Sequence, residues 1–180
     1  ATDCTLITAR RDGPQLVEVR SLLGLMPVMK AETTSRLCGL WHAAGVLADG
    51  LLAQQHAHSL RVVYAPKAHG AQTMHLVSST PRLSTCALFS SVASLLGGAG
   101  QANYSAANAC LDALATCRRT HGGAASSVQW GAWAEVGMAA RGAASERAAA
   151  MEATSVFGRI GLAHGLASLG TAVRHGAPSV

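Results

Sequence analysis

Short apolar runs separated by glycine, proline and polar residues divide the chain into alternating segments. Five of the runs are short and apolar on both faces, which is typical of strands buried inside a parallel sheet. We expect strands at residues 5–9, 25–29, 37–44, 85–90 and 125–130. The serines at the end of the fourth run and the tryptophan at the end of the fifth place polar or bulky groups at strand ends.

Longer segments carry apolar residues at helical spacing, which predicts helices at residues 16–23, 50–63, 66–79, 101–119 and 159–174. Residues 138–154 are rich in alanine and are expected to be helical or mobile. Pro66 should begin a new helix, because proline is favoured in a first helical turn. Strands that alternate with helices predict an α/β fold, with a Rossmann-like parallel sheet flanked by helices.

Composition supports a packed domain. The 180 residues are 49% hydrophobic and 13% charged, which fits one domain over 1–180 and excludes disorder from low hydrophobicity. No apolar run approaches the roughly 18 residues of a membrane span, so we expect no membrane association and a cytoplasmic location. The first residues resemble no signal peptide, and the missing initial Met suggests a piece of a longer chain.

The net charge of +5 does not predict a nucleic-acid partner, because the basic residues are scattered and aromatic residues make up only 4%. A phosphate-bearing cofactor explains the basic surface equally well. The five cysteines form no CxxC pair and the eight histidines no paired-ligand pattern, so no metal site is expected. We expect Cys86, Cys110 and Cys117 to be buried reduced thiols.

Polar side chains gather where the predicted strands end, and ligands of parallel sheets bind beyond those ends. Ser91 ends one strand, and Tyr104 and Asn108 lie four residues apart on one face of the next helix. Lys67 opens a helix after Pro66, early enough to lean toward the same end of the sheet. This set of side chains suits the reduction of a carbonyl group.

Each residue type has a defined use in that chemistry. Tyrosine has an ordinary pKa of about 10, and a nearby ammonium such as that of Lys67 should move the pKa of Tyr104 toward the working range. A serine hydroxyl can bind the carbonyl oxygen where negative charge develops. An asparagine can hold a water that resupplies the proton.

Taken singly, every one of these residues also has a structural interpretation. Ser91 could cap a strand end, Tyr104 could be a half-buried aromatic residue, and Asn108 and Lys67 could be solvated on helix surfaces. Only their joint spacing favours a site. Two further residues stay open in the same way: Asp49 could cap the next helix, and His42 is expected to be packed rather than catalytic.

Five stretches, in order and with matching spacing, closely resemble the ketoreductases of polyketide synthases, which are members of the short-chain dehydrogenase/reductase superfamily. The stretches are residues 42–50, 65–70, 88–93, 100–108 and 130–133. The resemblance extends over about residues 37–138 and returns near 161–178. Lysine upstream of the tyrosine, with Asn108 four residues after Tyr104, resembles the polyketide and animal fatty-acid synthase type.

The resemblance implies an NADPH-dependent ketoreductase with the following roles. Tyr104 would donate the proton to the substrate ketone, Ser91 would orient the carbonyl, Lys67 would support the tyrosine and the cofactor ribose, and Asn108 would maintain a proton relay. The other residues implied to contact the cofactor are His42, Ala43, Ala44, Gly45, Trp130 and Gly131, and Arg10 or Arg11 could meet an adenosine 2′-phosphate.

The resemblance also addresses the configuration of the product. The type that makes a D-configured hydroxyl carries Leu-Asp-Asp, where this chain has Leu47, Ala48 and Asp49. The opposite type has a tryptophan eight residues before the tyrosine, where this chain has Leu96. The B-type, with a D-hydroxyl product, is therefore favoured. The residues implied in substrate contact and stereocontrol are Asp49, Leu96, Gln101, Trp133 and Met138.

The partners implied are an acyl carrier protein bearing a 3-ketoacyl chain and the neighbouring domains of a megasynthase. The first strand and Gly-rich turn of the family are apparently missing, and residues 1–36 resemble a truncated, divergent remnant of the cofactor-binding half. We expect weak cofactor binding and poor folding from the chain alone. A degenerate, non-catalytic structural domain is therefore the alternative function.

Overall fold

The computed structural model describes residues 39–78, 83–137 and 158–174. The expected elements at residues 5–9, 16–23, 25–29 and 138–154 lie outside these ranges. So do three predicted site residues, Arg10, Arg11 and Met138.

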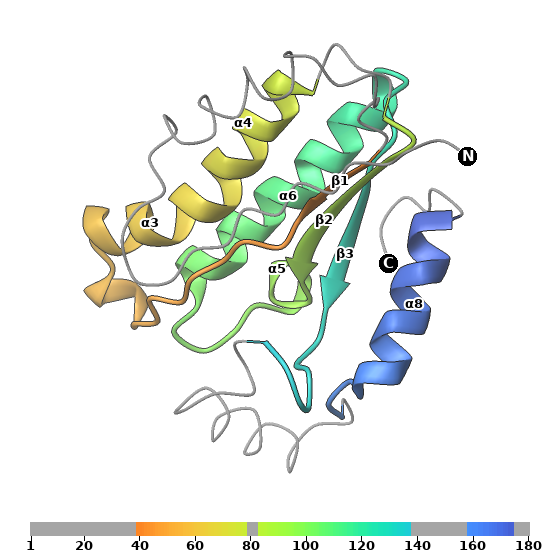
Figure 1. Ribbon diagram of the computed structural model, residues 1–180. Coiled ribbons are helices and arrows are strands. Elements are labelled where there is room, and N and C mark those ends of the chain that lie inside the picture. Colours follow the sequence, from red (N-terminus) through yellow and green to blue (C-terminus); the bar gives the residue numbers. More distant parts are fainter. Residues whose placement is uncertain (1–38, 79–82, 138–157, 175–180) are drawn as a thin grey trace.

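Three parallel strands form the sheet, in the order β1-β2-β3 (Figure 1). They are β1 (Gly39–His42), β2 (Thr85–Ser91) and β3 (Ser126–Trp130). In register, Gly39 pairs with Thr85 at one end and Ser91 with Trp130 at the other. The predicted strands at 85–90 and 125–130 are confirmed to within one residue, and the one at 37–44 is shorter than expected.

Helices cover both faces of the sheet, as the pattern of doubly apolar strands predicted. On one face lie α3 (Ala57–Tyr64), the π-helical turn η2 (Ala65–His69), α4 (Gly70–Val77) and α6 (Ala102–Thr120) (Figure 1). The short helix α5 (Ala93–Leu96) follows β2 and packs on α6. On the other face α8 (Leu162–Arg174) packs against β3.

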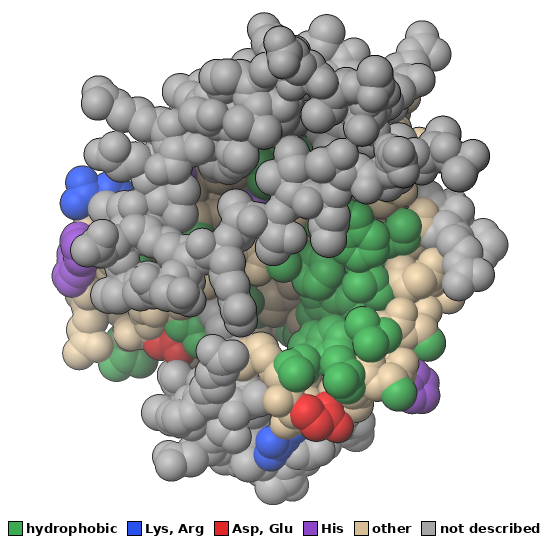
Figure 2. Space-filling view, in the orientation of Figure 1, with side chains coloured by type: hydrophobic (Ala, Val, Ile, Leu, Met, Phe, Trp, Pro, Cys, Tyr) green, Lys and Arg blue, Asp and Glu red, His purple; other side chains and the backbone are tan. Residues whose placement is uncertain are grey.

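Each face of the sheet has its own apolar core. Toward α4 and α6, Leu88 of β2 is buried against Ala71 and Leu111. Toward α8, Val128 and Trp130 of β3 pack on Leu169 and Ala172. Exposed Leu162 and Leu166 on α8 leave hydrophobic side chains on the surface over that helix (Figure 2).

Gly165 of α8 lies directly on the ring of Trp133, where a Cβ atom would come within 2.2 Å of a ring carbon. Any larger residue would therefore push the helix away from the tryptophan. A parallel β-bridge joins Trp133 to Ile160, just before α8. The predicted helix at 159–174 therefore begins three residues later than expected, at Leu162.

Pro66 does not begin a new helix, which corrects the sequence-based expectation. The chain runs from α3 through η2 into α4 without a break, and Pro66 lies in the π-helical turn between them. A π-turn has one residue more than a regular turn, so a residue without an N–H can be accommodated there without ending the helix.

The predicted helix at 50–63 starts later than expected. Residues 52–54 form the 3-10 turn η1 (Leu52–Gln54), and α3 begins only after His56. The His56 Nδ1 atom accepts from the Ser59 N–H at 3.2 Å, and the Ser59 hydroxyl accepts from the His56 N–H at 3.1 Å. This reciprocal cap satisfies two backbone donors and fixes the start of α3.

The cysteine prediction holds for one of three thiols. Cys86 is buried in β2, whereas Cys110 and Cys117 are exposed on α6, because the apolar stripe of that helix runs through Leu111 and Ala115 instead. Within the described ranges, no group of three or more metal-ligating side chains occurs. No helix in the same ranges is long and apolar enough to cross a membrane.

Candidate active site

Tyr104, Lys67, Ser91 and Asn108 come together beyond the carboxyl end of β2. Ser91 is the last residue of the strand, and Tyr104 and Asn108 lie in the first two turns of α6. The Lys67 Nζ atom lies 5.3 Å from the centroid of the Tyr104 ring, and the side chains of Ser91 and Asn108 both act on the Tyr104 hydroxyl. The spacing in the sequence therefore predicted a real cluster.

Lys67 is buried, with only 3% of its surface exposed. It is therefore not solvated on a helix surface, which was the purely structural interpretation of this residue. Its Nζ atom donates to the backbone carbonyl of Phe89 at 3.0 Å. Burial lowers the pKa of Lys67 to about 8, and the negative charge of Asp112 opposes that effect. The ammonium therefore persists at neutral pH and is lost on mild alkalinisation.

Tyr104 is also buried, and burial raises the pKa of its hydroxyl. Hydrogen bonding by Asn108 and Ser91 lowers this pKa less than burial raises it, and the charge of Asp49 raises it further. The expected lowering by Lys67 is not observed, because the pKa of Lys67 is about 8 and its ammonium is lost before a tyrosine with a raised pKa ionises. Tyr104 is therefore fully protonated at neutral pH, as a proton donor must be.

Asn108 is completely buried rather than solvated on the helix surface. Its Nδ2 atom donates to the Tyr104 carbonyl at 2.8 Å, and its backbone carbonyl accepts from the Ser90 hydroxyl at 3.3 Å. The Oδ1 atom is buried and has no hydrogen-bond partner among the described residues. A buried acceptor of this kind is a natural position for a bound water.

Ser91 combines its two possible roles. Its Oγ atom accepts from the Ala93 N–H at 3.2 Å, which is the capping contact of the structural alternative. The same hydroxyl lies near Tyr104 and acts to lower the pKa of the tyrosine. Because Ser91 is half-buried at the strand end, it remains open to a ligand from the solvent side.

His42 is packed, as expected. It is buried, its Nε2 atom lies 2.9 Å from the Pro66 carbonyl, and burial followed by the Lys67 charge lowers its pKa to about 4. The imidazole is therefore neutral. Beyond it, exposed Ala43 and Ala44 carry side chains small enough for the close approach of a ligand.

The predicted stereocontrol residues approach one another beside α6. The Gln101 Nε2 atom lies 3.4 and 3.5 Å from the two Asp49 carboxylate oxygens, and Asn103 Nδ2 donates to the Ala48 carbonyl at 2.8 Å. The structure does not support a capping role for Asp49, because the residue at the N-terminus of η1 is Leu51. Leu96 is exposed on α5.

Trp130, Gly131 and Trp133 lie at the carboxyl end of β3, at the same end of the sheet. The ring centroids of Trp130 and Trp133 are 4.8 Å apart, and the Trp130 ring also lies 5.8 Å from Phe89. Trp130 is buried toward α8, in the core of that face. Its Nε1 atom has no hydrogen-bond partner in the described part of the chain.

One polar group near this cluster was not predicted. The Asp112 carboxylate accepts hydrogen bonds from Ser94, Ser127 and Gln129. The sequence did hold a signal for it, because Asp112 lies four residues after Asn108 and eight after Tyr104, on the same helical face. An acidic residue on the sheet-facing side of a helix must have polar partners.

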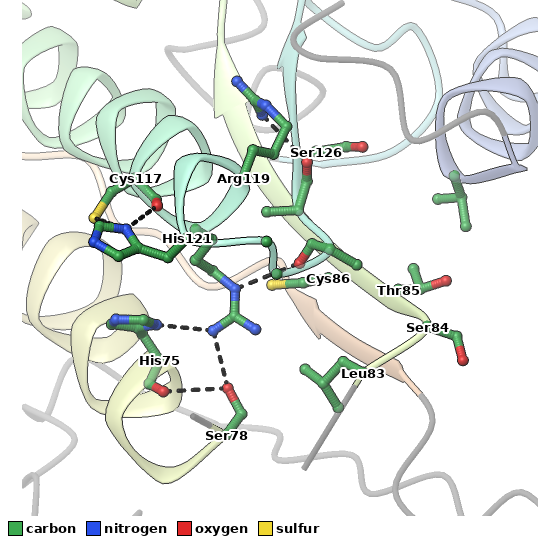
Figure 3. Close-up of a pocket in the computed structure, with 16 residues that line it drawn as sticks. His75, Ser78, Leu83, Ser84, Thr85, Cys86, Cys117, Arg119, His121 and Ser126 are labelled. Atoms are coloured by element: carbon green, nitrogen blue, oxygen red, sulfur yellow. Dashed lines mark hydrogen bonds between the residues drawn. The ribbon is translucent and has the colours of Figure 1, made fainter. Parts of the chain in front are cut away.

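A cavity of about 1150 Å³ lies at the opposite, amino end of the strands (Figure 3). Its lining includes the first residues of β2 and β3 and the end of α6. Arg118 is buried there, donating through Nη1 to His75 at 2.9 Å and Ser78 at 3.2 Å, and through Nε to the Ala124 carbonyl at 3.4 Å. The predicted site residues lie at the other end of the sheet.

The family model described as "KR domain" matches residues 18–135. Polyketide synthase GfsA of Streptomyces halstedii is 51% identical over 102 residues, which cover 57% of this chain and 1% of that protein. The spectinabilin polyketide synthase system protein NorB of Streptomyces orinoci is 42% identical over 131 residues, which cover 73% of this chain and 6% of that protein. The chain thus spans a few per cent of these relatives.

Solved structures give the same result for the fold. A structure of A-type ketoreductases from a modular polyketide synthase superposes with a TM-score of 0.80 at 31% identity, covering 90% of this chain and 33% of the other. PlmKR1, a ketoreductase from the first module of phoslactomycin biosynthesis in Streptomyces sp. HK803, superposes with a TM-score of 0.75 at 35% identity, covering 87% and 35%.

Proposed function

Since the chain belongs to the KR domain family of polyketide synthase ketoreductases, which are nicotinamide-dependent oxidoreductases, we propose that it reduces the 3-keto group of an acyl thioester with NADPH. The observation that carries the proposal is the buried Lys67 ammonium against the ring of Tyr104, next to Ser91 and Asn108. Burial of an amine with one hydrogen-bond acceptor among the described residues costs stability, which favours a functional reason for its position.

The reduction adds a hydride to the carbonyl carbon and a proton to the carbonyl oxygen, which gives a secondary alcohol. The reduced nicotinamide, when bound, supplies the hydride. Tyr104 donates the proton from its hydroxyl and becomes a phenolate, while the C=O double bond becomes a C–O single bond. The raised pKa of Tyr104 keeps that proton in place until negative charge develops on the substrate oxygen.

The other three residues support this transfer. The Lys67 ammonium stabilises the phenolate, and the Ser91 hydroxyl donates a hydrogen bond to the substrate oxygen as its charge grows. Asn108 holds a water at its unpartnered Oδ1 atom, from which Tyr104 can recover its proton. The segment from His42 to Gly45 accepts the ribose, where Ala43 and Ala44 leave room for it.

Two features support the choice of cofactor and of substrate carrier. The basic pair Arg10–Arg11 provides guanidinium groups that suit an adenosine 2′-phosphate, which distinguishes NADPH from NADH. The relatives are polyketide synthases, in which an acyl carrier protein would present the 3-ketoacyl chain. A non-catalytic spacer is not favoured, because such a domain has no use for a buried lysine.

Tyr104→Phe tests the proposed function in the full-length protein. The variant should lose about 10² to 10⁴ of the rate on a 3-ketoacyl thioester, because general acid catalysis contributes that much, while NADPH binding stays intact. Tyr64→Phe, at the other tyrosine of the chain, is the matched control and should keep its rate. A Tyr104→Phe enzyme with more than half the wild-type rate would exclude the assigned role.

The configuration of the product tests the assignment of Asp49 and Leu96. We expect the D-alcohol, although two of the similar structures are described as A-type, because type depends on a few residues at the mouth of the site and not on the fold. Chiral chromatography of the reduced thioester measures the outcome. A predominantly L-configured product would show that these two positions do not control stereochemistry here.

A further inference from the structure

Asp112 holds three elements of the fold together beneath the proposed catalytic residues. Its carboxylate accepts from the Ser94 hydroxyl at 2.6 Å, from Gln129 Nε2 at 2.9 Å and from the Ser127 hydroxyl. Ser94 lies in α5, Ser127 and Gln129 lie in β3, and Asp112 itself lies in α6. Hydrogen bonds to an ionised acceptor are stronger than neutral ones, so this junction is firm.

The junction reaches the corner that carries Ser91. The Ser94 hydroxyl lies 2.8 Å from the Ser91 carbonyl as well as 2.6 Å from Asp112, and Gln129 Nε2 also approaches it at 3.3 Å. The turn after β2 is therefore tied to the middle of α6. The first turns of the same helix carry Tyr104 and Asn108, so the distance between Ser91 and Tyr104 depends on this tie.

The carboxylate also acts on Lys67 by its charge. The titratable groups that face Lys67 are His42 from β1 and Tyr104 and Asp112 from α6. His42 is neutral because its pKa is about 4, and Tyr104 is neutral because burial raises its pKa. Asp112 is thus the negative charge that offsets the buried ammonium.

We propose that Asp112 is a positioning residue for the ketone reduction, which fixes the Ser91 corner against the Tyr104 helix. This inference rests on the proposed function. It assigns no contact between Asp112 and the substrate or cofactor, and every effect passes through Ser94 or Lys67.

Asp112→Asn separates charge from shape. The amide keeps the size of the side chain and one acceptor oxygen but removes the negative charge that raises the pKa of Lys67. Without that charge the ammonium loses its proton at a lower pH, so the alkaline limb of kcat against pH should move below its wild-type position near pH 8. The value of kcat at neutral pH should fall by about tenfold, whereas KM for NADPH should not change.

Ser94→Ala and Glu135→Gln complete the design in the full-length protein. Ser94→Ala removes the tie but keeps the charge, so kcat should fall severalfold with the alkaline limb unmoved. Glu135→Gln removes a carboxylate that, among the described residues, accepts a hydrogen bond from the Leu162 N–H at 3.0 Å, and it should change neither quantity. If Asp112→Asn does not fold, Ser94→Ala still tests the geometric half.

Each result has one meaning. A shifted limb in Asp112→Asn alone, with a slower Ser94→Ala enzyme, supports the inference. A Ser94→Ala enzyme as fast as wild type, or a folded Asp112→Asn enzyme with the wild-type kcat, overturns it. A wild-type protein that does not reduce a 3-ketoacyl thioester with NADPH overturns the proposed function instead, which keeps the two failures distinct.

Discussion

The two ends of one sheet each bury a cation beside the same helix, and they treat it differently. At the carboxyl end, Lys67 donates to one carbonyl within the described residues, that of Phe89, and lies against the Tyr104 ring. At the amino end, the Arg118 guanidinium donates to Ala124, His75 and Ser78. Lys67 can lose its charge near neutral pH, whereas an arginine stays charged at any pH of interest.

The difference lies in how well each cation is compensated. Arg118 has several acceptors that replace the water it lost. Its hydrogen bonds connect α6 to the end of α4 and to Ala124, two residues before β3. The ammonium of Lys67 has three donors, and hydrogen bonds within the described residues use one of them. An under-compensated cation lowers stability but is available to a ligand, which is the usual property of a functional group.

Replacement of each cation by methionine should therefore have opposite effects. Lys67→Met should reduce the rate on a 3-ketoacyl thioester by about 10²-fold or more while raising the free energy of unfolding by about 1–3 kcal/mol. Arg118→Met should leave kcat per folded molecule unchanged but lower the free energy of unfolding by about 1–3 kcal/mol, since it strands its acceptors. Urea titration and steady-state kinetics measure both; equal signs of the two stability changes would refute the distinction.

The pH dependence sharpens the same contrast. The pKa of Lys67 is about 8 and its ammonium is the active form, so kcat should decline as pH rises through about 8. Arg118→Lys introduces an amine at the amino end and serves as a control, because a titrating group there should not alter the profile. A rate that stays constant from pH 7 to 10 would show that the charge of Lys67 is not needed.

Two glycines with left-handed backbones give the smallest effect. Gly100 has φ +72 and lies against the backbone of Gly50, next to Asp49, whereas Gly122 has φ +75 and open space around it. Alanine at either position should cost about 1 kcal/mol of stability. The Gly50 N–H donates to the Gly100 carbonyl at 2.8 Å, so a shift at Gly100 would also move Asp49, the neighbour of Gly50. Only Gly100→Ala should therefore alter product configuration or KM as well. Identical kinetics in both variants would argue against control by that loop.

The sequence predicted the cluster better than it predicted the state of its members. Strand ends and the four-residue spacing of Tyr104 and Asn108 are properties of local pattern, and the side chains that they predicted to gather do lie together beyond the end of β2. The raised pKa of Tyr104 depends on its burial, which is decided by packing between η2, β2 and α6. No local pattern contains that information.

The prediction at Pro66 was wrong for a related reason. Proline normally marks a helix start, and the preference is correct for isolated helices. Here the neighbouring residues override it: the Pro66 carbonyl lies 2.9 Å from His42 Nε2, and Gly70 packs so closely on that imidazole that a Cβ would lie 3.3 Å from it. Contacts with a strand more than twenty residues away keep the helix continuous.

The π-helical turn Ala65–His69 has a consequence for changes in chain length. Such a turn is equivalent to one residue inserted into a regular helix. Because the turn absorbs that extra residue, deletion of one residue there would restore a regular helix and would move the remaining residues of the turn around the helix axis. Lys67 would then leave the Tyr104 ring although no residue of the site had been substituted. The position of the Lys67 side chain therefore depends on the number of residues in this turn. A one-codon deletion there should damage activity as much as the loss of the amine does.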